Sequence, residues 1–280
     1  MMPHPVAVLC RTLGVSRSTA YRHGAPRGPY YAKADDALVE QQIRAILRTR
    51  GTYGHKRVTA LVNATYGTGY NRKRVRRVMR MLDLALPARR RRRNTRLHRG
   101  RIVRGHANER WCSDTLEIPC WNGEYVQLAF ALDCHDREIL SWVAAPRDLT
   151  GSDIQQLMRA AVAARFPRGW ALPTVQWLSD NGGPYTALAT VWEAERLGLT
   201  PITTPPASPQ SNGMSEALVN TLKRDYVDPA DCASAAAVLG QIVGWIADYN
   251  TVAPHSALGY RAPRTYRAER IPKEAQLANP

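Results

Sequence analysis

The sequence predicts a mixed α/β sheet flanked by helices and preceded by a smaller all-helical part. Three strand-like runs joined by short turns, at about 110–143, are followed by strands that alternate with helices, which is the pattern of a mixed sheet. Charge divides the chain in the same way. Residues 1–108 carry 25 Lys and Arg and four acidic residues, a net charge of +21, whereas residues 109–280 carry 14 and 19, a net charge of −5.

The first 28 residues have the pattern of a helix-turn-helix. Gly14 permits a tight turn after a short apolar helix, and Ser16 supplies an N-cap oxygen for a second helix. Arg17 and Arg22 would then lie on the exposed side of a recognition helix. Because the first helix begins almost at the N-terminus, we expect this module, residues 1–28, to be incomplete.

A second helical module is predicted over residues 29–86. Apolar periodicity places its helices at about 36–50, 55–63 and 71–82, with glycine-containing turns between them. A strongly basic helical part suits nucleic-acid binding, because contact with phosphates releases bound counterions. The candidate contacts are Lys56, Arg57, Arg72, Lys73 and Arg76, and we expect Arg74, Arg77 and Arg80 to be exposed beside the last three.

An arginine-rich linker follows at residues 87–108. Its unbroken run consists of Arg89, Arg90, Arg91, Arg92 and Arg93, whose like charges oppose compact folding. We expect an arm that follows a nucleic-acid backbone, and the alternative is a solvated connector.

Residues 109–270 are predicted to form the α/β part, and residues 271–280 a frayed tail. The expected strands are about 110–118, 125–133, 138–143, 174–179 and 199–203, and the expected helices are about 150–165, 185–197, 210–225 and 232–249.

Three acidic residues in this part have the surroundings of one metal site. Asp114 lies in an alternating strand, Asp180 ends an apolar strand just before Asn-Gly-Gly-Pro, and Glu216 falls near the first turn of a helix, with 35 residues between it and Asp180. Oxygen ligands without histidine or cysteine favour Mg²⁺, with Mn²⁺ as a substitute. Two such ions, bridged by Asp114, would suit phosphoryl transfer on a nucleic-acid backbone.

Four other acids compete for these roles. We interpret Asp153 as a helix-start residue, Asp136 as a turn residue and Glu117 as an exposed strand position. Asp133, at the end of a neighbouring strand, is the strongest competitor.

Composition excludes several classes of protein. The five cysteines form no CxxC pair, so we expect reduced, buried thiols rather than disulfides or a cysteine zinc site. No apolar run reaches the ~18 residues of a membrane span, and the N-terminus lacks a secretory signal. We therefore expect a cytoplasmic protein.

Several motifs together resemble one family. They are Trp111-Cys-Ser-Asp114, Leu178-Ser-Asp-Asn-Gly182, Ser208-Pro-Gln-Ser-Asn-Gly213 with Glu216 and Lys223, and Tyr249-Asn250 with Pro254-His-Ser-Ala-Leu-Gly-Tyr260. The chain resembles the DDE transposases of bacterial insertion sequences, which share the retroviral integrase core. It is similar over nearly its whole length to the catalytic product, often called OrfB, of elements encoded in two overlapping frames.

The resemblance implies an RNase H-like sheet with Asp114, Asp180 and Glu216 as metal ligands. It implies Mg²⁺-dependent cleavage at the terminal repeats of an element, transfer of the freed 3′-hydroxyls into target DNA, and a circular intermediate. At least a dimer is expected on DNA, and a fusion with, or partnership to, an upstream-frame product is compatible with the short first helix. Lys223, two helical turns after Glu216, is a candidate DNA contact.

Two other functions remain open at this stage. The first is a DNA-binding regulator without catalysis, which would not need the three acids. The second is an RNase H-like nuclease that only hydrolyses, which would not need the basic part. The chain has no His-His-Cys-Cys zinc module, Asn212 and Asn220 are weaker candidates to orient ligands, and His255 is interpreted as a structural turn residue.

Overall fold

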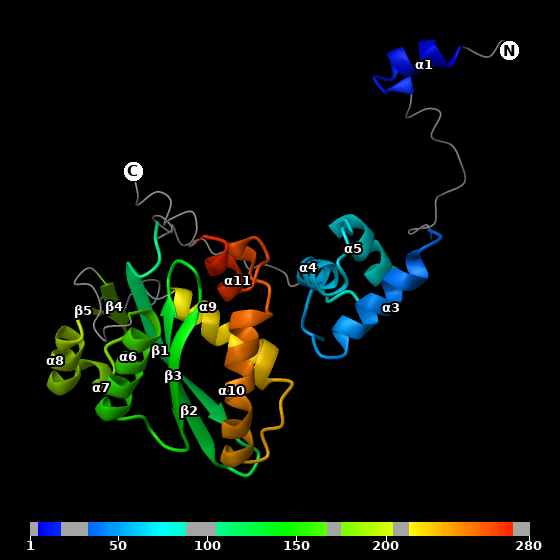
Figure 1. The fold of residues 1–280 in the computed structure, drawn as a ribbon. Helices are drawn as coiled ribbons and strands as arrows, with labels where there is room; N and C mark the ends of the chain where they lie inside the picture. The colour runs from blue at the N-terminus through cyan, green and yellow to red at the C-terminus, as the bar shows by residue number, and fades with distance from the viewer. Residues whose placement is uncertain (1–4, 18–32, 88–104, 167–174, 204–212, 271–280) are drawn as a thin grey trace. The chain divides into compact units, whose positions relative to one another are not determined.

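The computed structural model describes residues 5–17, 33–87, 105–166, 175–203 and 213–270. The chain divides at Pro87 into two compact units, which are described separately below (Figure 1).

The first predicted helix-turn-helix can be followed only through its first helix and turn. Helix α1 (Val6–Thr12) buries Cys10 and ends before Gly14, whose φ of 63° is the left-handed value that the predicted tight turn requires. Arg17 is exposed, whereas Arg22 and the remainder of the expected recognition helix lie outside the described residues.

The second helical module consists of α3 (Asp36–Leu47), α4 (His55–Tyr66) and α5 (Arg72–Met81). The side chain of Asn71 caps α5 by accepting from the Lys73 N–H at 2.8 Å. Helix α4 ends at Gly67, where φ is 62°. The three helices share one apolar core, which includes Val39, Ile43, Tyr53, Val58, Val62, Val75 and Met79.

Several expectations for this module are wrong. Helix α3 ends at Leu47 rather than at residue 50, and α4 continues to Tyr66 rather than ending at residue 63. Leu38, which the apolar periodicity of α3 places on the inward side, is 51% exposed. Arg74 and Arg77 do not point into solvent. Arg77 Nη2 lies 2.7 Å and Arg74 Nε lies 3.3 Å from Oδ1 of Asp36 on α3. Burial alone would raise the pKa of Asp36, but the hydrogen bond from Arg77 and the other donors lower it below the ordinary value.

The second unit is built on one mixed five-stranded sheet, as predicted. Its strands are β1 (Arg110–Pro119), β2 (Tyr125–Asp133), β3 (Ile139–Ala145), β4 (Val175–Ser179) and β5 (Leu199–Thr203), in the order β3-β2-β1-β4-β5. β1, β2 and β3 pair antiparallel, whereas β4 pairs parallel with both β1 and β5.

Helices cover both faces of this sheet (Figure 1). α6 (Gly151–Arg165), α7 (Gly183–Thr186) and α8 (Leu188–Arg196) belong to one face, where Trp111 and Trp177 are buried. α9 (Gly213–Leu222), the π-helical turn η2 (Lys223–Val227) and α10 (Ala235–Thr251) belong to the other, with Cys112 and Leu178. Period-two alternation along each strand therefore separates the two cores. The single helix expected at 185–197 is interrupted at Ala187, where ψ is 132°.

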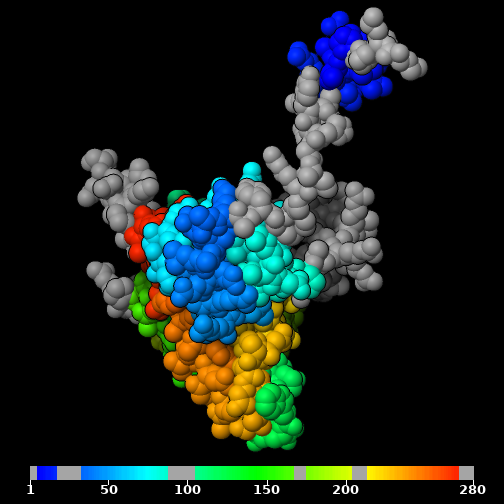
Figure 2. Space-filling model, turned by 90° about the vertical axis from the view of Figure 1, so that its right-hand side faces the viewer, coloured from blue at the N-terminus to red at the C-terminus, as the bar shows by residue number. Residues whose placement is uncertain are grey.

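The face carrying α9 and α10 is continuous with the β1–β2 turn (Figure 2). Glu124 in that turn accepts from the Ala235 N–H at 2.8 Å, at the N-terminus of α10, and the Trp121 N–H donates to Cys232 at 2.8 Å. The chain then passes through η3 (Ser256–Leu258) to α11 (Pro263–Ala268).

The competing acids have structural partners. Asp133 is fully buried and accepts backbone hydrogen bonds from Asn108 and His135 at 2.8 Å each. Asp153 forms the predicted cap with Thr150 at the start of α6, and the hydrogen bond from Arg147 is the main reason that its pKa is lowered. Asp136 lies in the β2–β3 turn and Glu117 is exposed on β1, both as expected.

All five cysteines are free and buried. Among the described helices, none combines the length and the apolar character that crossing a membrane requires.

Asn250 joins α10 to β3 through a pair of buried hydrogen bonds. Its Oδ1 accepts from the Ile139 N–H at 2.9 Å, and its Nδ2 donates to the Ile139 carbonyl at 2.8 Å. Asn250 is 1% exposed, so water does not replace these bonds if the amide is removed.

We expect Asn250→Ala to lower the free energy of unfolding by about 3 kcal/mol, because it leaves two buried backbone groups unpaired. Thr251→Ala is the matched control, since Thr251 is exposed on the same helix and bonds only within it. Urea unfolding measures both. Equal, small losses in the two variants would contradict this role for Asn250.

Candidate active site

The pairing of β1 with β4 sets the spacing of the first two acids. The parallel register matches Arg110 with Gln176 and Cys112 with Leu178. This pairing ends at Cys112 and Leu178, two residues before Asp114 and Asp180, and β4 ends at Ser179. Neighbouring strands lie about 4.8 Å apart, and residues in register point to the same face. Cys112 and Leu178 belong to the core under α9 and α10, so a continuation of the same register would set both carboxylates side by side on that face.

The third acid is carried to the same face by α9. Leu218 and Leu222 of this helix are buried in the core that contains Cys112. The Ser215 hydroxyl hydrogen-bonds to the Cys112 thiol, which ties the first turn of α9 to β1 two residues before Asp114. Glu216 follows Ser215 and is exposed.

Electrostatics indicate that the three acids share one site. Burial raises the pKa of Asp114, and the negative charges of Asp180 and Glu216 raise it further. The Thr115 N–H, which donates to Asp114 Oδ1 at 2.8 Å, opposes this shift. A half-buried carboxylate next to two others is stabilised by a cation.

The chemistry of the three donors fits a hard divalent ion, because all are carboxylate oxygens from different elements. As they stand, the described residues contain no group of three His, Cys, Asp or Glu side chains arranged to hold a metal ion. Chelation by Asp114, Asp180 and Glu216 therefore requires their carboxylates to approach one another more closely than in this structure.

The segment after β4 holds Asp180 in place, and sequence analysis did not identify its two supporting residues. The Gly182 N–H donates to Asp180 Oδ1 at 3.1 Å. Tyr185 on α7 is buried, and its hydroxyl lies 2.8 Å from Ser113 Oγ and also hydrogen-bonds to Thr115. The Asn-Gly-Gly-Pro-Tyr run after Asp180 is the sequence signal for this support.

Lys223 follows Glu216 by seven residues but does not continue the α-helix. α9 ends at Leu222, and Lys223 begins the π-helical turn. Lys223 is exposed and forms no ion pair within the described residues. Asn220 is exposed on α9, whereas Asn212 lies outside the described residues.

The candidate contacts of the helical module differ in their surroundings. Lys56, Arg72, Lys73 and Arg76 are exposed. Arg57 instead stacks over the Tyr53 ring, with Cζ 3.7 Å from the centroid. The arginine run at 89–93 lies outside the described residues.

His255 has structural contacts, as expected. Its ring packs edge-on against Tyr249 with centroids 4.5 Å apart, and its backbone N–H donates to the Arg261 carbonyl at 3.1 Å. These contacts fix the turn that leads into α11.

Comparison with known families identifies this arrangement. The integrase core domain family matches residues 104–209, and a second integrase core family matches residues 197–263. Transposase InsD of insertion element IS2 from Escherichia coli is 38% identical over 246 residues, which are 84% of this chain and 80% of the relative. The chain belongs to the insertion-sequence transposases.

Two further proteins are similar to large parts of this chain. An insertion element IS136 protein of Agrobacterium fabrum is 50% identical over 181 residues, which cover 64% of this chain and 93% of that protein. A solved simian T-cell lymphotropic virus intasome chain matches with 17% identity and a TM-score of 0.49, over 80% of this chain and 73% of that one.

Membership of this family establishes the class of the transposase. It is a DDE polynucleotidyl transferase with an integrase core, and its mixed sheet is the expected RNase H-like fold. An HTH-like domain family matches residues 33–93, which contain the second helical module.

Gly182 tests the geometry around Asp180. Its φ of −60° is open to alanine, but an added Cβ would lie 3.1 Å from Asp180 Oδ1. We expect Gly182→Ala to displace this carboxylate and lower Mg²⁺-dependent DNA cleavage about tenfold or more without unfolding the chain. Gly183→Ala is the control, because its Cβ would meet nothing within 4 Å. Equal cleavage by both variants would contradict this geometry.

Asp114→Asn should raise the melting temperature at pH 7 in metal-free buffer. Because the folded pKa of Asp114 is above its ordinary value of 3.8, the contribution that favours folding exists at low pH and is lost as pH rises through the raised pKa. The gain should therefore shrink as pH falls towards about 4.

Mg²⁺ should stabilise the wild-type chain in the same experiment but not Asp114→Asn, because binding to the folded state alone adds stability. Glu117→Gln, on the exposed side of the same strand, should respond like wild type. Equal Mg²⁺ stabilisation of all three chains would contradict a metal site at Asp114.

Proposed function

We propose that this transposase cleaves DNA at the ends of its element, frees 3′-hydroxyls and joins them to DNA by strand transfer, with Mg²⁺ held by Asp114, Asp180 and Glu216. The observation that carries the proposal is the β1–β4 register, whose continuation would set Asp114 beside Asp180 on the face that α9 covers. The raised pKa of Asp114 supports a shared site with Asp180 and Glu216.

Each part of the site has a chemical task. When bound, two divalent ions, with Mn²⁺ able to substitute, would activate the attacking oxygen and stabilise the leaving one. Asp114, Asp180 and Glu216 would hold these ions, and Gly182 and Tyr185 support the Asp180 segment. Lys223, exposed beyond the end of α9, contacts a terminal phosphate.

Substrate binding is assigned mainly to the basic residues before the core. The HTH-like similarity and the exposed Lys56, Arg72, Lys73 and Arg76 support contact with double-stranded terminal repeats. Arg57, Arg17 and Arg22 are proposed as further contacts. The arginine run at 89–93 follows the backbone of repeat or target DNA.

The reaction implies an assembly. Two DNA ends must be held together, so we propose at least a dimer, formed in the cytoplasm on DNA, with the copy-out route through a circular intermediate. The chain acts alone or joined to an upstream-frame product. Size-exclusion chromatography with light scattering on end DNA distinguishes a dimer from a monomer.

Strand transfer tests the proposal directly. With Mg²⁺ and a labelled terminal-repeat duplex, the wild-type chain should yield joined or circular products. Asp114→Asn, Asp180→Asn and Glu216→Gln should each reduce them more than about 100-fold, because each removes a metal ligand. Binding of the duplex should persist in all three variants.

Glu117→Gln provides the matched control, since Glu117 is an exposed acid on the same strand as Asp114. Retained joining in the three variants, or an equal loss in Glu117→Gln, would overturn the assignment. Cleavage without any joining would favour a hydrolytic nuclease, and DNA binding without cleavage would favour a regulator.

A further inference from the structure

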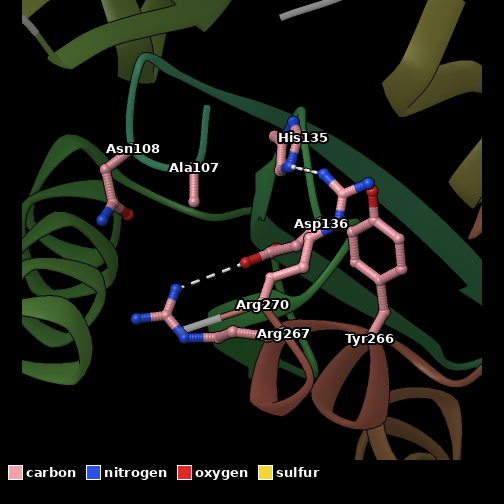
Figure 3. A pocket seen from close by; sticks show the side chains of 7 residues that line it. All are labelled: Ala107, Asn108, His135, Asp136, Tyr266, Arg267 and Arg270. Atoms are coloured by element: carbon pink, nitrogen blue, oxygen red, sulfur yellow. Dashed lines mark hydrogen bonds and ion pairs between the residues drawn. The ribbon is translucent and has the colours of Figure 1, made fainter. Parts of the chain in front are cut away.

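A second, arginine-lined pocket lies in the core at the end of the sheet where β1 begins (Figure 3). Its volume is about 90 Å³, and its lining includes Asn108, His135, Asp136, Tyr266, Arg267 and Arg270. These residues come from the segment before β1, the β2–β3 turn, and α11 with the turn after it. The space accommodates several waters or one phosphate group. None of the candidate catalytic acids lines it.

The carboxylate in this pocket is already neutralised. Asp136 is 1% exposed, and its Oδ2 accepts from Arg165 Nη2 at 2.8 Å and from Arg267 Nη1 at 3.3 Å. Its Oδ1 accepts from the Glu138 N–H at 3.0 Å. A cation would have to displace two guanidinium groups, so Asp136 does not make the pocket a cation site.

Arg270 has no such partner. Its Nη1 lies 3.4 Å from His135 Nε2, and its Cζ lies 4.5 Å from the centre of the Tyr266 ring (Figure 3). It forms no ion pair with a carboxylate of the described residues, in contrast to Arg264 and Arg267 on α11 just before it. One guanidinium charge at the pocket therefore remains without a counter-charge.

Two neutral side chains that can donate also line the pocket, Tyr266 beside Arg270 and Asn108 on the other side of it (Figure 3). The side-chain oxygen of Asn108 accepts from Trp111 Nε1 at 3.3 Å, and its Nδ2 has no acceptor within the described part of the chain. The Tyr266 hydroxyl likewise has no hydrogen-bond partner there, although the ring is 8% exposed. A pocket that offers a guanidinium, an amide N–H and a hydroxyl recognises an anion with several acceptor oxygens.

Positive charge is concentrated around this pocket, although residues 109–280 as a whole are acidic. Residues 109–280 carry a net charge of −5, from 14 basic and 19 acidic residues, yet Arg261, Arg264, Arg267 and Arg270 recur at every third position. Around the β2–β3 turn, Arg165, Arg264 and Arg267 bond to Asp136 or Glu138, Arg261 pairs with Glu269, and Arg270 lies beside His135. A local excess of positive charge attracts a phosphate backbone.

We propose that this pocket binds a backbone phosphate of the DNA, with Arg270 as its charged ligand and Asn108 and Tyr266 as neutral donors. The inference rests on DNA as the partner of the transposase. It adds an anchoring point on the catalytic core itself, apart from the basic residues that precede the core.

Salt-dependent binding of the full chain to a labelled duplex tests this site. Arg270→Gln should weaken binding about tenfold and reduce the slope of log K against log salt by about 0.9, the value for one phosphate contact. The loss should be the same for terminal-repeat and unrelated duplexes, because phosphate contacts carry no sequence information. Asn108→Asp should act similarly, since it places a carboxylate in the pocket at a φ of 64° that Asp tolerates.

Arg264→Gln is the matched control. It removes the same charge from α11, six residues before Arg270, but Arg264 bonds to Glu138 at 3.0 Å and does not line the pocket. The slope should stay at the wild-type value, and thermal unfolding checks that all variants are folded. If Arg270→Gln does not fold, the salt dependence of DNA binding by Asn108→Asp tests the pocket instead.

Equal slopes in Arg270→Gln and Arg264→Gln, or wild-type binding by Asn108→Asp, would overturn the assignment. The outcome is separate from that of the strand-transfer test. A chain that never joins DNA ends but shows the Arg270-dependent slope would refute the proposed reaction and leave the pocket assigned.

Discussion

β1 and β4 pair in parallel through Arg110, Trp111 and Cys112, and the position of the candidate catalytic acids depends on this pairing. A shift of one residue would turn either Asp114 or Asp180 to the opposite face of the sheet. The register is held from both sides, because Trp111 and Trp177 are buried under α6 while Cys112 and Leu178 are buried under α9 and α10. Burial on two faces therefore fixes the separation of two carboxylates that repel each other.

Further contacts act on the same strand. Ser215 ties α9 to Cys112, and Tyr185 ties the segment after β4 to Ser113 and Thr115. Asp114 thus lies between two anchoring points along β1. This arrangement lowers the stability of the folded chain, because the negative charges of Asp180 and Glu216 act on Asp114 and raise its pKa. Sites built for chemistry often oppose stability in this way.

Patterns in the sequence are sufficient to predict the strands of the sheet and to select the candidate acids. Alternation placed all five strands within about two residues, and the turn after Asp180 marked it as a strand-end carboxylate. Asp133 could not be separated from Asp114 by sequence, because its role depends on backbone donors at residues 108 and 135 that lie near it only after β1 and β2 have paired.

The wrong predictions have the same cause, which is that the decisive contacts join residues far apart in the sequence. Arg74 and Arg77 lie on the polar side of α5, and only the packing of α3 brings Asp36 to them. The break at Ala187 follows the docking of Tyr185 against β1, and no local residue signals it. The sequence does not single out Arg270, because its significance depends on which neighbouring arginines pair with carboxylates.

Two kinds of positive charge emerge from the structure. One kind neutralises carboxylates within the fold, as Arg165 does for Asp136 and Arg77 does for Asp36. The other kind, which includes Arg72, Arg76 and Lys223, is exposed. Net charge alone overstates the positive surface that is available to DNA, because some of the arginines in each unit already pair with carboxylates of that unit.

The central claim is that Asp114, Asp180 and Glu216 hold divalent ions together. Anomalous diffraction from crystals of the full chain with Mn²⁺ and end DNA tests it most directly. The account predicts anomalous density in contact with Asp114 and Asp180, within reach of Glu216. Mn²⁺ bound instead at Asp133 and Asp136, with none near Asp114, would contradict it.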